Sequence, residues 1–117
     1  MANPVVHFEI AAKDSVKSRQ FYQDLFGWEI QVDQAMNYGL IAPAGDKSIG
    51  GGIGPLQPGV TPYVTFYVLV DDLQVALDKA AKLGGKVTLP PTPIPGVGSS
   101  AMFTDPDGNV IGLFKSL

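Results

Sequence analysis

The chain repeats itself once, at a spacing of 58 residues, which is about half of its length. At this spacing Val6–Ile10 aligns with Val64–Val68. The same shift aligns three pairs of identical residues: Asp14 with Asp72, Leu25 with Leu83, and Gly27 with Gly85. These identities fall at cap, core and turn positions, where structure dictates the residue type. The sequence therefore predicts two copies of one small structural unit.

The first copy reads as a strand, a helix and three further short strands. Asp14 or Ser15 is suited to cap the helix, and Gly27 is suited to end it. The helix has an apolar face that we expect to pack, formed by Val16, Phe21, Tyr22, Leu25 and Phe26. The expected strands are Val5–Ala11, Trp28–Val32, Tyr38–Ala42 and Lys47–Ile53.

The second copy shows the same order with clearer periodicity. Asp71 or Asp72 is suited to cap a helix whose apolar residues keep helical spacing, namely Leu73, Ala76, Leu77, Ala80 and Ala81. The expected strands are Tyr63–Val70, Lys86–Leu89, Ser99–Thr104 and Asn109–Phe114. Each copy alone is too small to bury its sheet well. We therefore predict one α+β domain over residues 1–117, with βαβββ modules at about 4–54 and 62–117.

Composition excludes several classes of partner and site. The net charge is −3 and the chain has one Arg, so neither nucleic acid nor an anionic membrane is an expected partner. The absence of Cys excludes disulfides and thiolate nucleophiles. No signal peptide and no apolar run of about 20 residues is visible, which favours a cytoplasmic protein.

Five stretches, in this order, resemble the vicinal oxygen chelate superfamily, which includes glyoxalase I, extradiol dioxygenases and bleomycin-resistance proteins. They are Val6–Ile10, Phe21–Trp28, Val70–Asp72, Gly84–Val87 and Asp105–Asn109. The resemblance implies that the two modules form a cupped mixed sheet with helices on its outer face, and that the protein is a homodimer. Activities differ widely within such a superfamily, so the fold does not define one.

Metal-dependent members of that superfamily take four ligands from the first and last strands of each half. His7 falls on the first of these positions, but the repeat places Thr65 at the matching one. Gly112 stands where the pattern usually ends in Glu, and the remaining position lies within Gly50–Ile53. A catalytic divalent metal needs about three His, Cys or carboxylate ligands, and the chain has one His and two Glu. We therefore expect neither a metal nor another cofactor.

Strand alternation separates a polar face from an apolar one. His7 and Glu9 share one face, and Thr65 and Tyr67 share the corresponding face of the second copy. The resemblance adds Gly112 and Phe114 to this set of expected ligand-binding residues. The opposite face of the fifth strand is expected to lie under the helices, and consists of Val64, Phe66, Val68 and Val70.

Three functions remain open at this point. The first is binding of a small organic ligand in a metal-free cavity. The second is a lyase, isomerase or dioxygenase-type enzyme, either metal-dependent or using His7 and Glu9 as an acid/base pair. The third is a dimeric interaction module with no cavity. For His7 and Glu9 themselves, the alternatives are catalysis, a hydrogen-bonding anchor, or a remnant without function.

Two further segments have an unusual composition. Gly50–Pro55 is rich in glycine but lacks the Lys and Ser/Thr of a phosphate-binding loop, so it is better explained as a strand that something approaches closely, or as a flexible rim. Pro90–Gly98 is a stiff segment with few N–H donors, either a lid or a long connection between strands.

Overall fold

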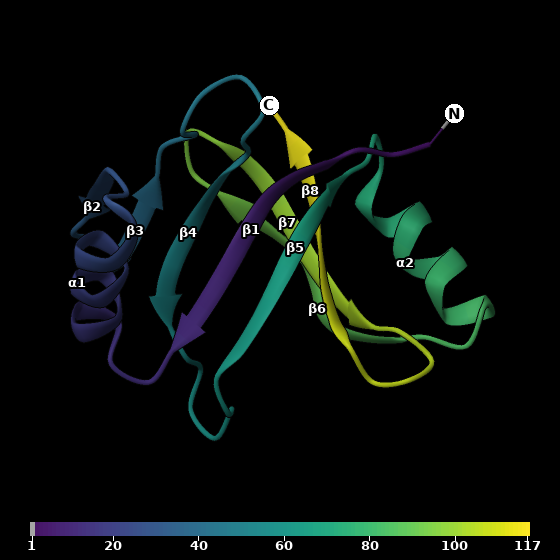
Figure 1. The fold of residues 1–117 in the computed structure, drawn as a ribbon. Helices are drawn as coiled ribbons and strands as arrows, with labels where there is room; N and C mark the ends of the chain where they lie inside the picture. Colours follow the sequence, from purple (N-terminus) through teal and green to yellow (C-terminus); the bar gives the residue numbers. More distant parts are fainter. Residues whose placement is uncertain (1) are drawn as a thin grey trace. The chain divides into compact units, whose positions relative to one another are not determined.

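The structure is a computed structural model that describes residues 2–117, and it divides into two compact units. The N-terminal unit comprises His7–Val64, and the C-terminal unit comprises Thr65–Leu117 together with the residues up to Val6. The N-terminal copy contains β1 (Val5–Ala12), α1 (Ser15–Phe26), β2 (Ile30–Asp33), β3 (Tyr38–Ile41) and β4 (Gly50–Pro55). The C-terminal copy contains β5 (Tyr63–Leu69), α2 (Leu73–Lys82), β6 (Lys86–Ile94), β7 (Gly98–Thr104) and β8 (Val110–Ser116). The predicted α+β class with two βαβββ modules is confirmed (Figure 1).

The two units have the same mixed sheet topology. In the N-terminal unit the order is β2-β3-β4-β1, and in the C-terminal unit it is β6-β7-β8-β5. The first and last strands of each copy are parallel neighbours: β1 pairs with β4, and β5 pairs with β8. The other pairs are antiparallel. The repeat seen in the sequence is therefore a repeat of strand order and direction.

The helices begin at the two aspartates that the repeat aligns. The Asp14 carboxylate accepts from Lys17 N at 3.1 Å, and the Asp72 carboxylate accepts from Val75 N at 3.1 Å. Each bond satisfies one of the free N–H groups of a first helical turn. Gly27 ends α1 at φ 69°, in the left-handed region that favours glycine. Among residues 2–117, neither helix is long and apolar enough to cross a membrane.

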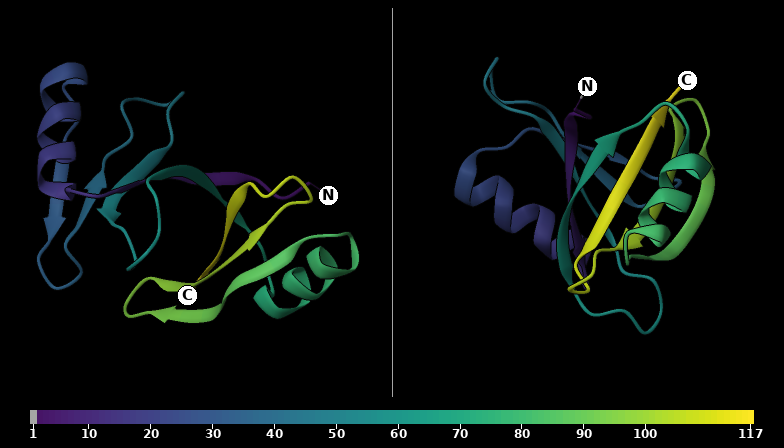
Figure 2. Two further views of the ribbon diagram at one scale, coloured as in Figure 1. Left: turned by 90° about the horizontal axis from the view of Figure 1, so that it is seen from below. Right: turned by 90° about the vertical axis from the view of Figure 1, so that its right-hand side faces the viewer.

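Each helix lies on its own unit's sheet (Figure 2). Between helix and sheet of each unit lies a small core. In the N-terminal unit the core residues Ala12, Ile41 and Ile53 are surrounded by Phe8, Ile10, Tyr22, Trp28 and Ile30. In the C-terminal unit the core residues Leu73, Leu77, Ala101 and Leu113 are surrounded by Val68, Val70, Ala76 and Phe103. Burial of apolar side chains contributes about 25 cal/mol per Å², so these clusters stabilise the two units.

Two of the packing predictions are partly wrong. Of the five apolar residues of α1 that were expected to pack, only Tyr22 is half-buried, whereas the other four are more than half exposed: Val16, Phe21, Leu25 and Phe26. Val68 on β5 and Val70, which follows the strand, pack against the core residues of α2 as predicted, but Val64 and Phe66 on β5 are exposed. The reason for the second error is that residue alternation defines a face of a strand but not how far along it the covering helix extends.

The proline-rich segment belongs to the sheet. β6 continues through Ile94 and pairs with β7, with Thr92 opposite Ser100. Its register shifts on both sides of Leu89. Because prolines lack an N–H group, they are confined to edge strands and bulges, and β6 is the edge of its sheet. Residues 90–94 are therefore a paired strand and not a lid.

Candidate functional site

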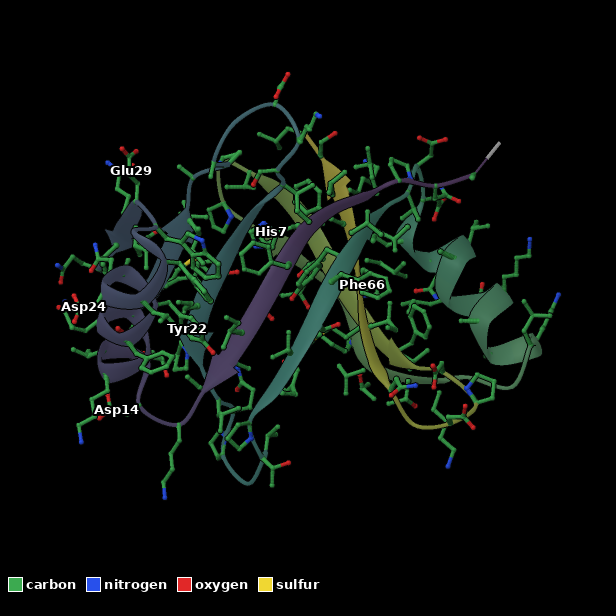
Figure 3. All side chains as sticks on the ribbon, viewed as in Figure 1. His7, Asp14, Tyr22, Asp24, Glu29 and Phe66 are labelled. Atoms are coloured by element: carbon green, nitrogen blue, oxygen red, sulfur yellow. The ribbon has the colours of Figure 1, made fainter. Side chains whose placement is uncertain are left out.

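His7, Tyr38 and Glu9 form a hydrogen-bonded chain in the N-terminal unit. His7 Nε2 lies 2.9 Å from the Tyr38 hydroxyl, and that hydroxyl donates to Glu9 Oε1 over 2.9 Å. His7 and Glu9 come from β1 and share one face of it, whereas Tyr38 is the first residue of β3. All three side chains are half-buried, and Figure 3 labels His7 on β1. Tyr38, which the sequence analysis missed, thus links the two predicted residues His7 and Glu9 by hydrogen bonds.

The glycines of β4 make this chain possible. β4 lies between β1 and β3, so the Tyr38 side chain has to cross it to reach Glu9. A Cβ atom at Gly52 would overlap the Tyr38 hydroxyl and ring, and one at Gly54 would come within 2.7 Å of that ring. On the opposite face, a Cβ at Gly51 would overlap the ring of Phe8. The prediction that this glycine run permits a close approach to the backbone is confirmed.

The direction of the hydrogen bonds assigns the proton on His7. The Tyr38 hydroxyl has one proton, which it donates to Glu9. It therefore accepts from His7, so that Nε2 carries hydrogen. Burial lowers the pKa of His7 below its usual 6.5 because desolvation disfavours the imidazolium. The neutral Nε2–H form is the one that fits both observations.

Glu9 also affects the pKa of a second tyrosine of the same unit, Tyr63. Burial raises the pKa of the Tyr63 hydroxyl, and the negative charge of Glu9 raises it further. Both effects disfavour a phenolate. Tyr63 is consequently a neutral hydroxyl beside a carboxylate.

The four remaining predicted residues lie in the C-terminal unit. Thr65 is buried, and its hydroxyl donates to the carbonyl of Val110 over 2.6 Å. Tyr67 lies opposite Gly112 on the neighbouring strand, and a Cβ at that glycine would overlap the tyrosine ring. Phe114 is half-buried on β8. In both units, then, a tyrosine ring lies across a glycine of the last strand.

The residues at the expected metal positions do not fit a metal ion. His7 Nε2 bonds to Tyr38, and the Thr65 hydroxyl is used by a backbone carbonyl. The last strands offer Gly52 and Gly112, which have no side-chain donor. Among residues 2–117, no three His, Cys, Asp or Glu side chains lie close enough together to hold an ion.

Tyr38 was missed because nothing in its own neighbourhood of the sequence marks it. Its role depends on the pairing of β3 with β4 and of β4 with β1. The signal that points to it is indirect. Consecutive glycines in a buried strand remove side chains from both faces, and this predicts that a large side chain of an adjacent strand crosses them.

Comparisons with known proteins agree with this architecture. The sequence model of the "Glyoxalase/Bleomycin resistance protein/Dioxygenase superfamily" matches residues 5–113. A crystal structure of a glyoxalase/bleomycin resistance protein/dioxygenase superfamily member from Vibrio splendidus 12B01 has a TM-score of 0.65 and 17% identity, and the match covers 98% of this chain and 100% of that one. This last likeness concerns the fold alone.

Two curated relatives are considerably longer than this chain. "Putative glyoxylase CFP32" of Mycobacterium tuberculosis is 35% identical over 98 residues, covering 81% of this chain and 37% of the relative. "Anthracycline biosynthesis protein DnrV" of Streptomyces peucetius is 27% identical over 124 residues, covering 92% of this chain and 45% of the relative. The chain therefore spans less than half the length of either. With the family matched over nearly all of its residues, the chain belongs to the glyoxalase/bleomycin resistance protein/dioxygenase superfamily.

Proposed function

We propose that the protein binds a small organic molecule, without a metal ion, through the face that carries His7, Tyr38 and Glu9. The observation that supports this most is the hydrogen-bonded chain itself, with its two contacts of 2.9 Å. Binding sites commonly hold a few well-positioned polar groups among aromatic side chains. Here an imidazole, a phenol and a carboxylate are oriented by one another, and the tyrosine ring lies over Gly52 and Gly54, which have no side chains to obstruct it.

The names of the relatives favour binding as the shared property. One relative is named as a glyoxylase and another as a protein of anthracycline biosynthesis. These names describe different chemistry, and both are compatible with a fold that holds an organic molecule. The donor set of this chain does not support the metal-dependent route, as argued above from Thr65, Gly52 and Gly112.

A second candidate function is metal-free acid/base catalysis by His7 and Glu9. It is supported by the hydroxyl of Tyr38, which connects the two groups and would transmit a proton between them. His7→Ala distinguishes the two functions. If the protein only binds its ligand, His7→Ala lowers the affinity for that ligand through the loss of one contact. Under catalysis, it abolishes turnover while the bound complex still forms.

The C-terminal unit carries further candidate contacts with a ligand. Tyr67, whose ring lies across Gly112, would contribute a flat aromatic surface and a hydroxyl, and Phe114 an apolar one. Thr65 would shape this face rather than bind directly, because its hydroxyl donates to Val110. Each unit's residues are tested by their own variants, Tyr38→Phe and Tyr67→Phe.

The experiment combines native mass spectrometry with a ligand screen. Native spectra of freshly purified protein report carried small molecules, metal content and the number of subunits. Any compound that binds only the folded state raises the melting temperature, by an amount that grows with concentration above Kd. We expect stabilising compounds whose effect is reduced in Tyr38→Phe. If no compound in a broad screen stabilises the protein and native spectra show the bare polypeptide, the binding function is wrong.

We also propose that the protein is a homodimer. On α1, Phe21 and Leu25 lie one helical turn apart on the same side of the helix, and they are 59% and 58% exposed. Contiguous exposed apolar side chains are typical of interaction surfaces. A second copy of the chain is the partner that we propose for this surface.

A further inference from the structure

We propose that Arg19 is a positioning residue for the candidate site: from α1 it holds both chain neighbours of Tyr38 and thereby keeps the tyrosine hydroxyl in the hydrogen-bonded chain. This inference rests on the proposed binding function and adds to it a residue that acts on the site from the opposite face of the sheet. It is carried by a cluster of polar side chains in the N-terminal unit and by the backbone conformation of the residue before Tyr38.

The residue before Tyr38 has an uncommon backbone conformation. Among residues 2–117, Asn37 is the only one other than glycine with a positive φ, at 51°. It ends the turn between β2 and β3, whose strands pair up to Asp33 opposite Tyr38. Asparagine tolerates the left-handed region better than most residues, but such a conformation persists only where the surrounding structure holds it. The conformation of Asn37 sets the direction in which β3 leaves the turn, and with it the place of Tyr38.

Two residues of α1 hold the Asn37 side chain. Arg19 Nη1 donates to Asn37 Oδ1 over 3.4 Å, and Asn37 Nδ2 donates to Ser15 Oγ over 3.3 Å. Arg19 Nη1 also donates to Ser15 Oγ over 3.4 Å, so the three side chains close a triangle. Ser15 is only 5% exposed, which fixes this triangle on the side of α1 that packs on the unit. The turn before Tyr38 is thus tied to the helix by side-chain hydrogen bonds.

The residue after Tyr38 contacts the stem of the same arginine. A Cβ atom at Gly39 would lie 2.5 Å from Arg19 Cδ and 2.8 Å from Ile30 Cγ2, closer than two carbon atoms approach without a shift. The stem therefore lies against the buried backbone of Gly39. Arginine commonly packs its stem in this way while its guanidinium reaches polar partners. One side chain accordingly contacts both Asn37 and Gly39.

Arg19 acts from the face of the sheet opposite to the tyrosine ring. Successive residues of a strand point to opposite faces, so a side chain at Gly39 and the ring of Tyr38 lie on different sides of β3. The ring lies over Gly52, whereas the arginine approaches from α1. The Tyr38 hydroxyl lies 2.9 Å from each of its two partners, and hydrogen bonds weaken steeply when their geometry changes. A shift of the backbone at 37–39 is therefore expected to break them.

The test follows the contact between His7 and Tyr38 by NMR on the protein without added ligand. His7 is the only histidine of the chain, and its Nε2 lies 2.9 Å from the Tyr38 hydroxyl, so protons of the two rings give a nuclear Overhauser cross-peak. The Tyr38 signals are assigned by their absence from Tyr38→Phe. Arg19→Met keeps an apolar stem and removes the guanidinium. We expect this variant to lose the cross-peak, measured against the cross-peaks within the Tyr38 ring.

The same helix offers a matched control for the charge. Lys17 is exposed on α1, and Lys17→Met removes one positive charge just as Arg19→Met does. We expect Lys17→Met to keep the cross-peak between the two rings. Loss of the cross-peak in both variants would show that the charge of α1, and not the contacts of Arg19, is responsible.

A pair of variants at Asn37 separates the hydrogen bonds from the backbone conformation. Asn37→Gly permits the positive φ but removes the amide. Asn37→Asp also tolerates the left-handed region and keeps an oxygen that accepts from Arg19. We expect the cross-peak to be lost in Asn37→Gly and retained in Asn37→Asp. Equal cross-peaks in the two variants would overturn the inference, and this pair decides the matter where Arg19→Met does not fold.

The outcomes also separate positioning from a purely structural role and from the proposed function. A structural role would lower the free energy of unfolding in Arg19→Met but leave the cross-peak of the folded protein unchanged, and that result overturns the inference. Absence of the cross-peak from the unmodified protein overturns it as well. The ligand screen tests the binding function separately: if no compound binds, that function is wrong, whereas the effect of Arg19 on Tyr38 is decided by the cross-peak alone.

Discussion

The side chain of Tyr38 lies directly over Gly52, so closely that a Cβ atom at the glycine would overlap the phenol. This relationship connects a feature of the sequence, a run of glycines in β4, with the geometry of the candidate site. Glycine in a strand interior ordinarily weakens the strand. Here, because Gly52 has no side chain, Tyr38 on β3 can reach across β4 to Glu9 on β1.

Substituting Gly52→Ala is expected to destabilise the protein, although alanine is the better strand residue. The added methyl group displaces Tyr38, and overpacking of this kind costs about 1–3 kcal/mol. The free energy of unfolding from urea titrations measures the effect. In a Tyr38→Ala background the same substitution is expected to be neutral or stabilising, because the clash is gone. Equal costs in both backgrounds would contradict the steric argument.

Substituting Tyr38→Phe keeps the ring and removes the hydroxyl from the chain. His7 Nε2 and Glu9 Oε1 each lose one hydrogen bond, and the loss of a hydrogen bond costs about 0.5–1.5 kcal/mol of stability. Urea titration measures the loss, and the nitrogen shifts of His7 report the change at its Nε2–H. Tyr22→Phe is a suitable comparison, since that ring packs against Trp28 with centroids 5.4 Å apart. A similar loss of unfolding free energy in Tyr38→Phe and Tyr22→Phe would show that the hydrogen bonds of Tyr38 do not contribute to stability.

The stability of the protein is expected to fall as the pH drops below about 6.5. Burial lowers the pKa of folded His7, whereas in the unfolded chain the imidazole keeps its usual value of 6.5. Between these two values the unfolded state binds a proton that the folded state does not bind, so acid favours unfolding. Above pH 6.5 the His7 imidazole is mostly neutral in both the folded and the unfolded state. His7 then contributes little to the pH dependence of stability.

Urea titrations from pH 8 to pH 5 measure this dependence. Because the chain has one histidine, a His7→Gln variant removes the whole effect within that range apart from the onset of carboxylate titration. An unchanged slope in His7→Gln would mean that groups other than His7 are responsible.

Local features of the fold were predictable, and long-range ones were not. The capping by Asp14 and the exit at Gly27 depend on neighbouring residues, and the structure confirms both. The repeat likewise predicted βαβββ twice. The pairing of β6 as far as Ile94 was missed because prolines suggest a loop, whereas an edge strand tolerates their missing N–H groups.

The candidate site was predictable only in part, for the same reason. Alternation along β1 placed His7 and Glu9 on one face, and the structure shows them joined there. Their connection through Tyr38 depends on which strand lies between β1 and β3 and on its register, and neither can be derived from local sequence. The expected packing of Phe21 and Leu25 is wrong because helical spacing identifies an apolar face without identifying what covers it.

That exposed face leads to the last prediction, which concerns assembly. Phe21 and Leu25 are one helical turn apart on α1 and are 59% and 58% exposed. Replacing both by Ser removes little buried surface from the folded chain, so the melting temperature of the monomer is expected to change little. If a second copy packs on this surface, the double variant shifts the sedimentation equilibrium from dimer to monomer. Val75→Ser, at a position 62% exposed on α2, is the matched change on the other helix and is expected to leave the dimer intact. A protein that sediments as a monomer before any substitution, or a double variant that remains dimeric, would show that this surface of α1 does not join two copies.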